Sequence, residues 1–214
     1  MDYSVDIWSK KSKKFLKKSK RLPATPNSML VRALHHKNLL PPPGKDLKML
    51  DVGCFDGGNM VYFAKYGYWV AGVDISQTEL KLAKNNLDRE GLNRYSLKIL
   101  KDETLEFPNE EFDFVLCWKT IYHTGCKEKF EKLLFEMTRV LKKGKHLIVS
   151  TFENDSLSIV NSEKIEEDLY KLKRDGGMYS IFYHFEDPNR MIDLLKKNGI
   201  DNIEIGSSSG YLLH

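Results

Sequence analysis

The 214-residue sequence has no apolar run near the roughly 18 residues that a membrane span requires. It has only three cysteines, Cys54, Cys117 and Cys126, and no Cys-x-x-Cys pair, which disfavours a disulfide framework or a zinc knuckle. Nothing at the N-terminus has the apolar core and cleavage site of a secretory signal. We therefore expect a cytoplasmic protein without a membrane span and without a metal requirement.

The chain also lacks internal repeats and low-complexity linkers, and its seven prolines and 41% hydrophobic residues are typical of a globular protein. Its length suits a single folded unit with its own hydrophobic core. We divide it into a basic N-terminal helical cap with its connector, residues 1–44, and a ligand-binding body, residues 45–214. The end of the connector, Leu40-Pro-Pro-Pro-Gly44, favours an extended backbone.

Charge is unevenly distributed along the sequence. The net charge is +4, but residues 1–40 alone carry +8, and eight of their basic residues lie between Lys10 and Arg21. Apolar residues interrupt this basic arm (residues 10–21) at roughly helical spacing, which predicts an amphipathic helix packed on the body. Such an arm suits a nucleic acid, a membrane surface or an anionic substrate, although charge runs are more often solvated helix faces.

From Lys48 onward, apolar strand-like runs alternate with amphipathic helical stretches, a pattern that predicts a parallel sheet covered by helices on both faces. The expected strands are 48–53, 68–74, 97–100, 112–118 and 146–152. The expected helices are 59–66, a helix opened by a capping box from Ser76 to Glu79, 127–143, and a last helix capped by Asp187. Segments 203–205 and 211–213 are expected to close the fold as a hairpin.

The stretch 153–180 is polar and helix-prone and lies between the fifth strand and the last helix. We expect residues 153–185 to form a lid over the carboxyl ends of the strands, where ligands bind in open α/β sheets.

The most informative stretch is Leu50-Asp-Val-Gly-Cys-Phe-Asp-Gly-Gly-Asn59, with Asp74 ending the next strand 21 residues after Gly53. Glycines let backbone amides approach a ligand closely, and an acid ending the adjacent strand can accept hydrogen bonds from ribose hydroxyls. The pattern fits an adenosine-containing cofactor. A dinucleotide fingerprint would need glycine at Phe55, and the phosphate-loop motif is absent.

In these residues the sequence resembles the class I S-adenosylmethionine-dependent methyltransferases of small-molecule type. Their first motif, acidic-x-Gly-x-Gly-x-Gly, is matched at Asp51, Gly53 and Gly57, with Phe55 in place of the middle glycine. Further stretches resemble, in order, the family's ribose-binding strand, its adenine-binding acid with the fourth strand, and its fifth strand: 70–76, 102–118 and 141–149. The resemblance covers residues 48–152 well and the remainder more weakly.

The resemblance implies an α/β fold: a Rossmann-like three-layer sandwich with a mostly parallel seven-stranded sheet and a C-terminal antiparallel hairpin. It implies S-adenosyl-L-methionine as cofactor and S-adenosyl-L-homocysteine as product. Asp74 would hold the ribose, Ile75 would pack on the adenine, and Asp102, beside Glu103, would accept from the adenine amino group. The methionine part would be lined by Asp51, Gly53, Cys54, Phe55 and Gly57, and Trp118 completes the cofactor-binding set. Each acid also has a plain structural alternative, such as a turn cap or an exposed loop residue.

Methyl transfer needs an aligned acceptor, excluded water and, for a hydroxyl or ammonium acceptor, a base. The segment after the fourth strand carries His123, whose ordinary pKa suits a general base, and Tyr122, which would orient the acceptor. His184 in the lid is the less favoured base. The alternative is that His123 only forms hydrogen bonds within its loop and that the lid aromatics are ordinary core.

The loop Cys117-Trp-Lys-Thr120 lacks the Asn/Asp-Pro-Pro-aromatic run of family members that methylate exocyclic base amines or glutamine amides. We therefore predict transfer to an oxygen or nitrogen of a small, anionic molecule, with the basic arm as its cap. Two alternatives stay open: an RNA methyltransferase whose arm contacts phosphates, and a non-catalytic binding protein of the same fold, for which Phe55 is the only hint. The sequence does not assign the acceptor or the oligomeric state.

Overall fold

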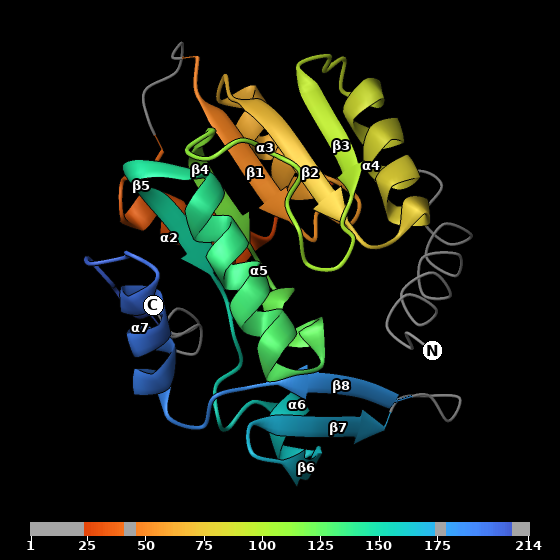
Figure 1. The fold of residues 1–214 in the computed structure, drawn as a ribbon. Coiled ribbons are helices and arrows are strands. Elements are labelled where there is room, and N and C mark those ends of the chain that lie inside the picture. The colour runs from red at the N-terminus through yellow and green to blue at the C-terminus, as the bar shows by residue number, and fades with distance from the viewer. Residues whose placement is uncertain (1–23, 41–45, 174–178, 207–214) are drawn as a thin grey trace.

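The computed structural model describes residues 24–40, 46–173 and 179–206 (Figure 1). The predicted basic arm, most of the connector and the second hairpin segment, 211–213, lie outside these residues. Within the described ranges, none of the helices combines the length and apolar character needed to span a bilayer.

A five-stranded parallel sheet in the order β3-β2-β1-β4-β5 forms the centre of the fold (Figure 1). Its strands are β1 Lys48–Val52, β2 Trp69–Asp74, β3 Tyr95–Ile99, β4 Phe112–Cys117 and β5 Leu141–Val149. The chain builds outward from β1 to β3 and then returns to the other side of β1 with β4. This reversal places a topological switch point between β1 and β4, and in open α/β sheets ligands bind outside the carboxyl ends of the strands at such a point.

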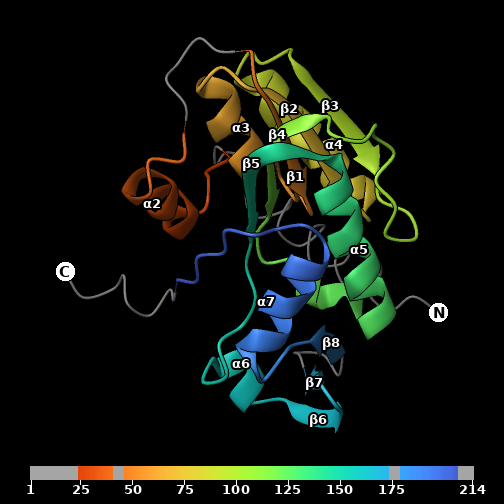
Figure 2. The same ribbon diagram turned by 60° about the vertical axis from the view of Figure 1, so that its left-hand side comes forward.

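Helices cover both faces of this sheet. They are α2 Ser28–His36, α3 Gly58–Lys65, α4 Gln77–Arg89, α5 Lys127–Val140 and α7 Pro188–Lys197. Alternate residues of β1 serve separate cores: Met49 packs with α2, α3 and α4, whereas Leu50 and Val52 pack with α5 and α7. Figure 2 shows α2 and α3 on one side of the sheet and α5 on the other. The predicted three-layer α/β class is therefore confirmed.

The predicted count of seven strands in one sheet is wrong. A second, antiparallel sheet in the order β6-β7-β8 is formed by β6 Glu163–Glu166, β7 Leu169–Lys173 and β8 Tyr179–Tyr183. It lies beyond the carboxyl ends of the parallel strands, next to the start of α5 (Figure 1). Residues 203–206 form no strand, so the first half of the predicted hairpin is absent.

The helix-prone character expected of residues 153–180 is also wrong for the described part, 153–173 and 179–180, apart from the single turn of α6, Leu157–Val160. Aromatic and branched residues in β7 and β8 pair across the strands, with Tyr170 opposite Phe182 and Lys171 opposite Ile181. Such pairs stabilise a sheet more than a helix. The small sheet packs on the short 3-10 helix η1, Ile121–Thr124, through a shared core that includes Tyr122 and Phe182.

The helix predicted at 127–143 ends at Val140, because Leu141 turns extended and pairs with Phe112 at the start of β5. Sheet pairing thus overrides the helical periodicity of the last residues. The fifth strand is correspondingly longer than predicted and begins five residues earlier.

Candidate functional site

The glycine turn (residues 53–57) connects β1 to α3 at the carboxyl edge of the sheet. Gly53 and Gly57 have φ of +77° and +76°, in the left-handed region that favours glycine. The N–H groups of Gly53 and Cys54 both donate to the carbonyl of Val73, at 2.8 and 3.0 Å. A side chain at position 53 would collide with Thr120, which follows β4. The turn is therefore held between the ends of β2 and β4, at the switch point.

Phe55 adopts φ +48° although it is not glycine. A left-handed conformation costs a residue with a Cβ about 1–2 kcal/mol. Its backbone N–H donates to Asp74 Oδ2 at 3.1 Å. The turn thus adopts the left-handed conformation that a glycine at this position would favour, and the Asp74 carboxylate holds it there.

Asp74 links this turn to the start of α4, because its other oxygen accepts from the N–H of Ser76 at 2.9 Å. The predicted capping box is wrong. Ser76 is the N-cap residue, but its side chain makes no capping hydrogen bond, and neither carboxyl oxygen of Glu79 has a hydrogen-bond partner. Glu79 belongs instead to the site.

Four acids, the buried Asp51, Asp74 and Glu79 and the half-buried Asp56, form what we call the buried acid cluster. Asp51 and Glu79 are each 1% exposed. Burial, with the nearby charge of Asp74, raises the pKa of Asp51 to about 7, although a hydrogen bond from the Asn59 side chain opposes the shift. Burial, with the charges of Asp74 and Asp56, raises the pKa of Glu79 to about 8.

Burial also raises the pKa of Asp74 and of Asp56, against backbone hydrogen bonds that lower both. Among the described residues, no Lys, Arg or His forms an ion pair with any member of the cluster. One oxygen of Asp51 and both oxygens of Glu79 are buried without a hydrogen-bond partner in the described part of the chain. Buried charges without partners are costly, so this arrangement is suited to a ligand that brings positive charge.

Asp102 and Glu103 lie in the β3 turn (residues 101–104), which follows β3. Both are left-handed, with φ of 48° and 52°, and the N–H of Thr104 donates to the carbonyl of Lys101 at 2.9 Å. The N–H of Leu100, just before the turn, donates to the carbonyl of Asp74 at 2.8 Å. The structure therefore brings the two acids predicted at the adenine to the same edge as Asp74 and Ile75.

Two other predicted cofactor residues have buried or half-buried side chains. Cys54 is buried near Met60, across from Gly72, and burial raises its thiol pKa well above the ordinary value. Trp118 packs against the same core, and its indole N–H is buried without a hydrogen-bond partner. The Cys54 side chain therefore packs in the core behind the glycine turn, and its backbone N–H is bonded to Val73.

The three predicted catalytic residues gather around two phenylalanines, Phe152 after β5 and Phe182 in β8. Tyr122 is buried with its ring 4.1 Å from that of Phe152, and the His123 ring is 5.1 Å from Phe182. His184 lies further along, 6.5 Å from Phe152. Tyr122 and His123 thus stand at the carboxyl end of β4, with the small sheet covering them.

His184 is enclosed more tightly than His123. Its Nε2 lies 2.8 Å from Oδ1 of Asn154, and because an amide oxygen only accepts, Nε2 carries the proton. Burial lowers the His184 pKa against the opposing charges of Asp168 and Glu186. The ring is therefore neutral near pH 7 and tied to the chain that leaves β5.

Several residues that shape the site were not predicted from the sequence. Glu79 was assigned to a cap, and Asp56 and Asn59 lie within the glycine motif without having been given a role. Thr120 follows β4 and limits residue 53 to glycine. The signal for Glu79 was present, because an acid in the first turn after Asp74 lies close to the carboxyl edge of the sheet.

Fold and site define a Rossmann-like α/β domain with an acidic ligand site at its switch point. Residues 50–149 match the family model described as Methyltransferase domain. The sequence is 33% identical over 147 residues to norajmaline N-methyltransferase of Rauvolfia serpentina, a match that covers 67% of this chain and 49% of that protein. It is 30% identical over 169 residues to a ubiquinone biosynthesis O-methyltransferase of Bartonella quintana, covering 77% and 64%.

The crystal structure of an S-adenosylmethionine-dependent methyltransferase from Methanosarcina mazei has the same fold, with a TM-score of 0.65 at 24% identity, covering 77% of this chain and 82% of that one. The chain therefore contains a class I S-adenosylmethionine-dependent methyltransferase domain, and the predicted family and cofactor are confirmed. The matches span about half to just under two thirds of the two curated relatives.

Proposed function

We propose that this chain transfers a methyl group from S-adenosylmethionine to an oxygen or nitrogen of a small molecule. The observation that carries the proposal is the buried acid cluster beside the glycine turn, at the switch point of a methyltransferase domain. The plant relative is named as an N-methyltransferase and the bacterial relative as an O-methyltransferase, which supports either acceptor atom.

The residues present fit this cofactor. The Asp74 carboxylate accepts backbone hydrogen bonds from Phe55, Ser76 and Ile75, and the remaining lone pairs of its two oxygens would accept from two ribose hydroxyls. The unpartnered oxygens of Asp51 and Glu79 are complementary to a cationic ligand. When bound, S-adenosylmethionine supplies an electrophilic methyl group on a positively charged sulfur, and the acid cluster would stabilise that charge.

On the acceptor side, residues at the end of β4 would orient the acceptor and remove its proton. His123 would take the proton that an acceptor hydroxyl or ammonium loses, and Tyr122 would orient the acceptor. Phe152 and Phe182 pack against these two residues and would keep competing water out. Residues 153–185 would thus serve as an acceptor lid built on the small sheet, and the basic arm would favour an anionic acceptor.

Calorimetry and an acceptor screen test this function. The full chain should bind S-adenosylmethionine and S-adenosylhomocysteine with micromolar affinity and transfer a labelled methyl group to a member of a small-molecule panel, read by mass spectrometry. Absence of binding to both cofactor forms would exclude the proposal. Binding without turnover, together with a His123→Ala variant that behaves like wild type, would favour the non-catalytic alternative. RNA affinity that depends on the arm and falls steeply with salt would favour an RNA acceptor.

A further inference from the structure

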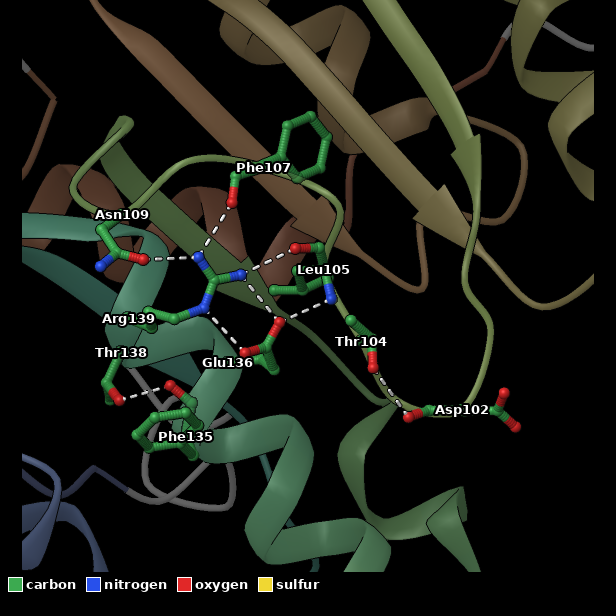
Figure 3. Close-up of polar contacts among 9 residues, drawn as sticks. All are labelled: Asp102, Thr104, Leu105, Phe107, Asn109, Phe135, Glu136, Thr138 and Arg139. Atoms are coloured by element: carbon green, nitrogen blue, oxygen red, sulfur yellow. Dashed lines mark hydrogen bonds and ion pairs between the residues drawn. The ribbon is translucent and has the colours of Figure 1, made fainter.

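The segment between β3 and β4 is irregular, yet two side chains of α5 fix it closely (Figure 3). Arg139 Nη1 donates to the carbonyl of Phe107 at 2.9 Å and to Oδ1 of Asn109 at 2.8 Å. Its Nη2 donates to the carbonyl of Leu105 at 2.8 Å. One guanidinium therefore binds three points of the segment.

Glu136 completes the attachment one helical turn earlier on α5. Its Oε2 accepts from the N–H of Leu105 at 2.8 Å, and its two oxygens accept from Nε and Nη2 of Arg139 at 2.7 and 2.8 Å. The pair thus holds both the N–H and the carbonyl of Leu105, which is itself 1% exposed. Hydrogen bonds from Arg139 hold the pKa of the Glu136 carboxyl below its usual range.

All five N–H groups of Arg139 are engaged: Nε once, and Nη1 and Nη2 twice each. This count matters because a planar guanidinium offers five donors in a fixed fork, whereas a lysine ammonium offers three from one point. Charge alone would be supplied equally by lysine. The arrangement therefore uses the geometry of arginine.

The attachment begins one residue after the β3 turn. That turn holds Asp102 and Glu103 in left-handed conformations without a glycine, and such conformations persist only where the surroundings impose them. Thr104 bonds back to Lys101 within the turn, and Lys129 in the first turn of α5 lies 3.6 Å from Glu103. Figure 3 shows the Asp102 carboxylate pointing away from the Glu136–Arg139 pair.

We propose that Glu136 and Arg139 are positioning residues that set cofactor specificity: by clamping Leu105 they hold the β3 turn so that Asp102 meets the adenine amino group. This inference rests on the proposed function. Neither residue would touch the cofactor. The clamp would favour adenosyl ligands over analogues in which the amino donor is replaced by a carbonyl, because a carbonyl oxygen offers Asp102 no proton.

The experiment compares two ligands by calorimetry, S-adenosylhomocysteine and S-inosylhomocysteine, which carries a carbonyl in place of the adenine amino group. Wild type should bind the adenosyl ligand at least about tenfold more tightly, the effect of one charge-assisted hydrogen bond. Arg139→Lys and Glu136→Gln should each lose about tenfold in affinity for the adenosyl ligand, with less than about a twofold change for the inosyl ligand.

The matched control is Glu131→Gln, which breaks the exposed pair with Lys127 on the same helix without touching the β3 segment; it should keep the wild-type preference. Should the clamp variants fail to fold, Asn109→Ala removes only the exposed end of the network and should shift the preference in the same direction by less.

An unchanged preference in folded clamp variants would overturn the positioning role alone. Equal weakening of both ligands would reduce the pair to a structural element and also overturn it. Failure of wild type to bind either ligand would remove the proposed function, and this inference with it.

Discussion

The backbone N–H of Phe55 donates to the carboxylate of Asp74 at 3.1 Å, so the residue that ends the second strand also holds the turn that follows the first. One side chain therefore has two tasks. It fixes a turn that contains a left-handed residue other than glycine, and it presents lone pairs at the edge where the ribose is proposed to lie.

Asp74→Ala should lower the affinity for S-adenosylmethionine by at least about 100-fold, because two ribose contacts and the support of the turn are lost together. Calorimetry measures the change, and thermal unfolding shows whether the variant is folded. Asp88→Asn, an exposed acid paired with Lys84 on α4, serves as control and should bind normally. An Asp74→Ala variant with wild-type affinity would contradict the site assignment.

The left-handed conformation of residue 55 predicts that glycine is more stable than alanine at that position, the reverse of their usual order in a helix. In an ordinary helix interior, alanine is about 1 kcal/mol more stable than glycine. At φ +48° the order reverses, so Phe55→Gly should be more stable than Phe55→Ala by about 1 kcal/mol. Urea unfolding of the two variants measures the difference. The control is Ala64→Gly in α3, which should lower the free energy of unfolding, as glycine usually does in a helix.

The acid cluster predicts a pH dependence of stability. Folding raises the pKa of Glu79 from 4.5 to about 8 and that of Asp51 from 3.8 to about 7. For an acid whose pKa is raised by folding, the contribution to stability is fully present below the unfolded pKa and is lost as the pH rises through the folded pKa. The ligand-free protein should therefore lose stability between about pH 4 and pH 8.

Glu79→Gln removes one of these ionisations and tests the sign. At pH 9 the variant should melt at least about 3 °C above wild type, the shift that about 1 kcal/mol produces in a chain of this size. Near pH 4, where the wild-type acid is protonated as well, the two should melt within about 1 °C of each other. Equal melting temperatures at pH 9 would show that Glu79 is not a destabilising buried charge.

The same cluster predicts discrimination between the two forms of the cofactor. S-adenosylmethionine carries one positive charge more than S-adenosylhomocysteine, so loss of an acid should weaken the charged form selectively. Asp51→Asn and Glu79→Gln should lower the ratio of the two affinities by roughly fivefold at pH 8, a change of about 1 kcal/mol. A uniform loss of affinity for both ligands would argue against charge recognition and for a purely structural effect.

Periodicity predicted β1, β2 and β4 and the start of α5 to within about two residues, because their apolar patterns match the burial that the sheet imposes. Periodicity failed where a contact between residues far apart in the sequence determines the local structure. Glu79 has the spacing of a capping box, but the N–H of Ser76 is taken by Asp74, which lies on another element. The clamp of Arg139 on residues 105–109 joins segments about 30 residues apart, and no local pattern encodes it.

Substitution of His123 and of His184 should affect different properties of the protein, catalysis in the first case and stability in the second. His123→Ala should lower kcat by about 100-fold or more, the usual effect of losing a general base, and change the cofactor affinity by less than about twofold. His184 is neutral and bonded to Asn154, so His184→Ala should lower the unfolding free energy by about 1–3 kcal/mol and leave kcat within a few-fold of wild type. His146→Ala on β5 is the control for both. Single-turnover kinetics with the acceptor found by the screen separate the two effects, and a reversed pattern would assign the base to His184.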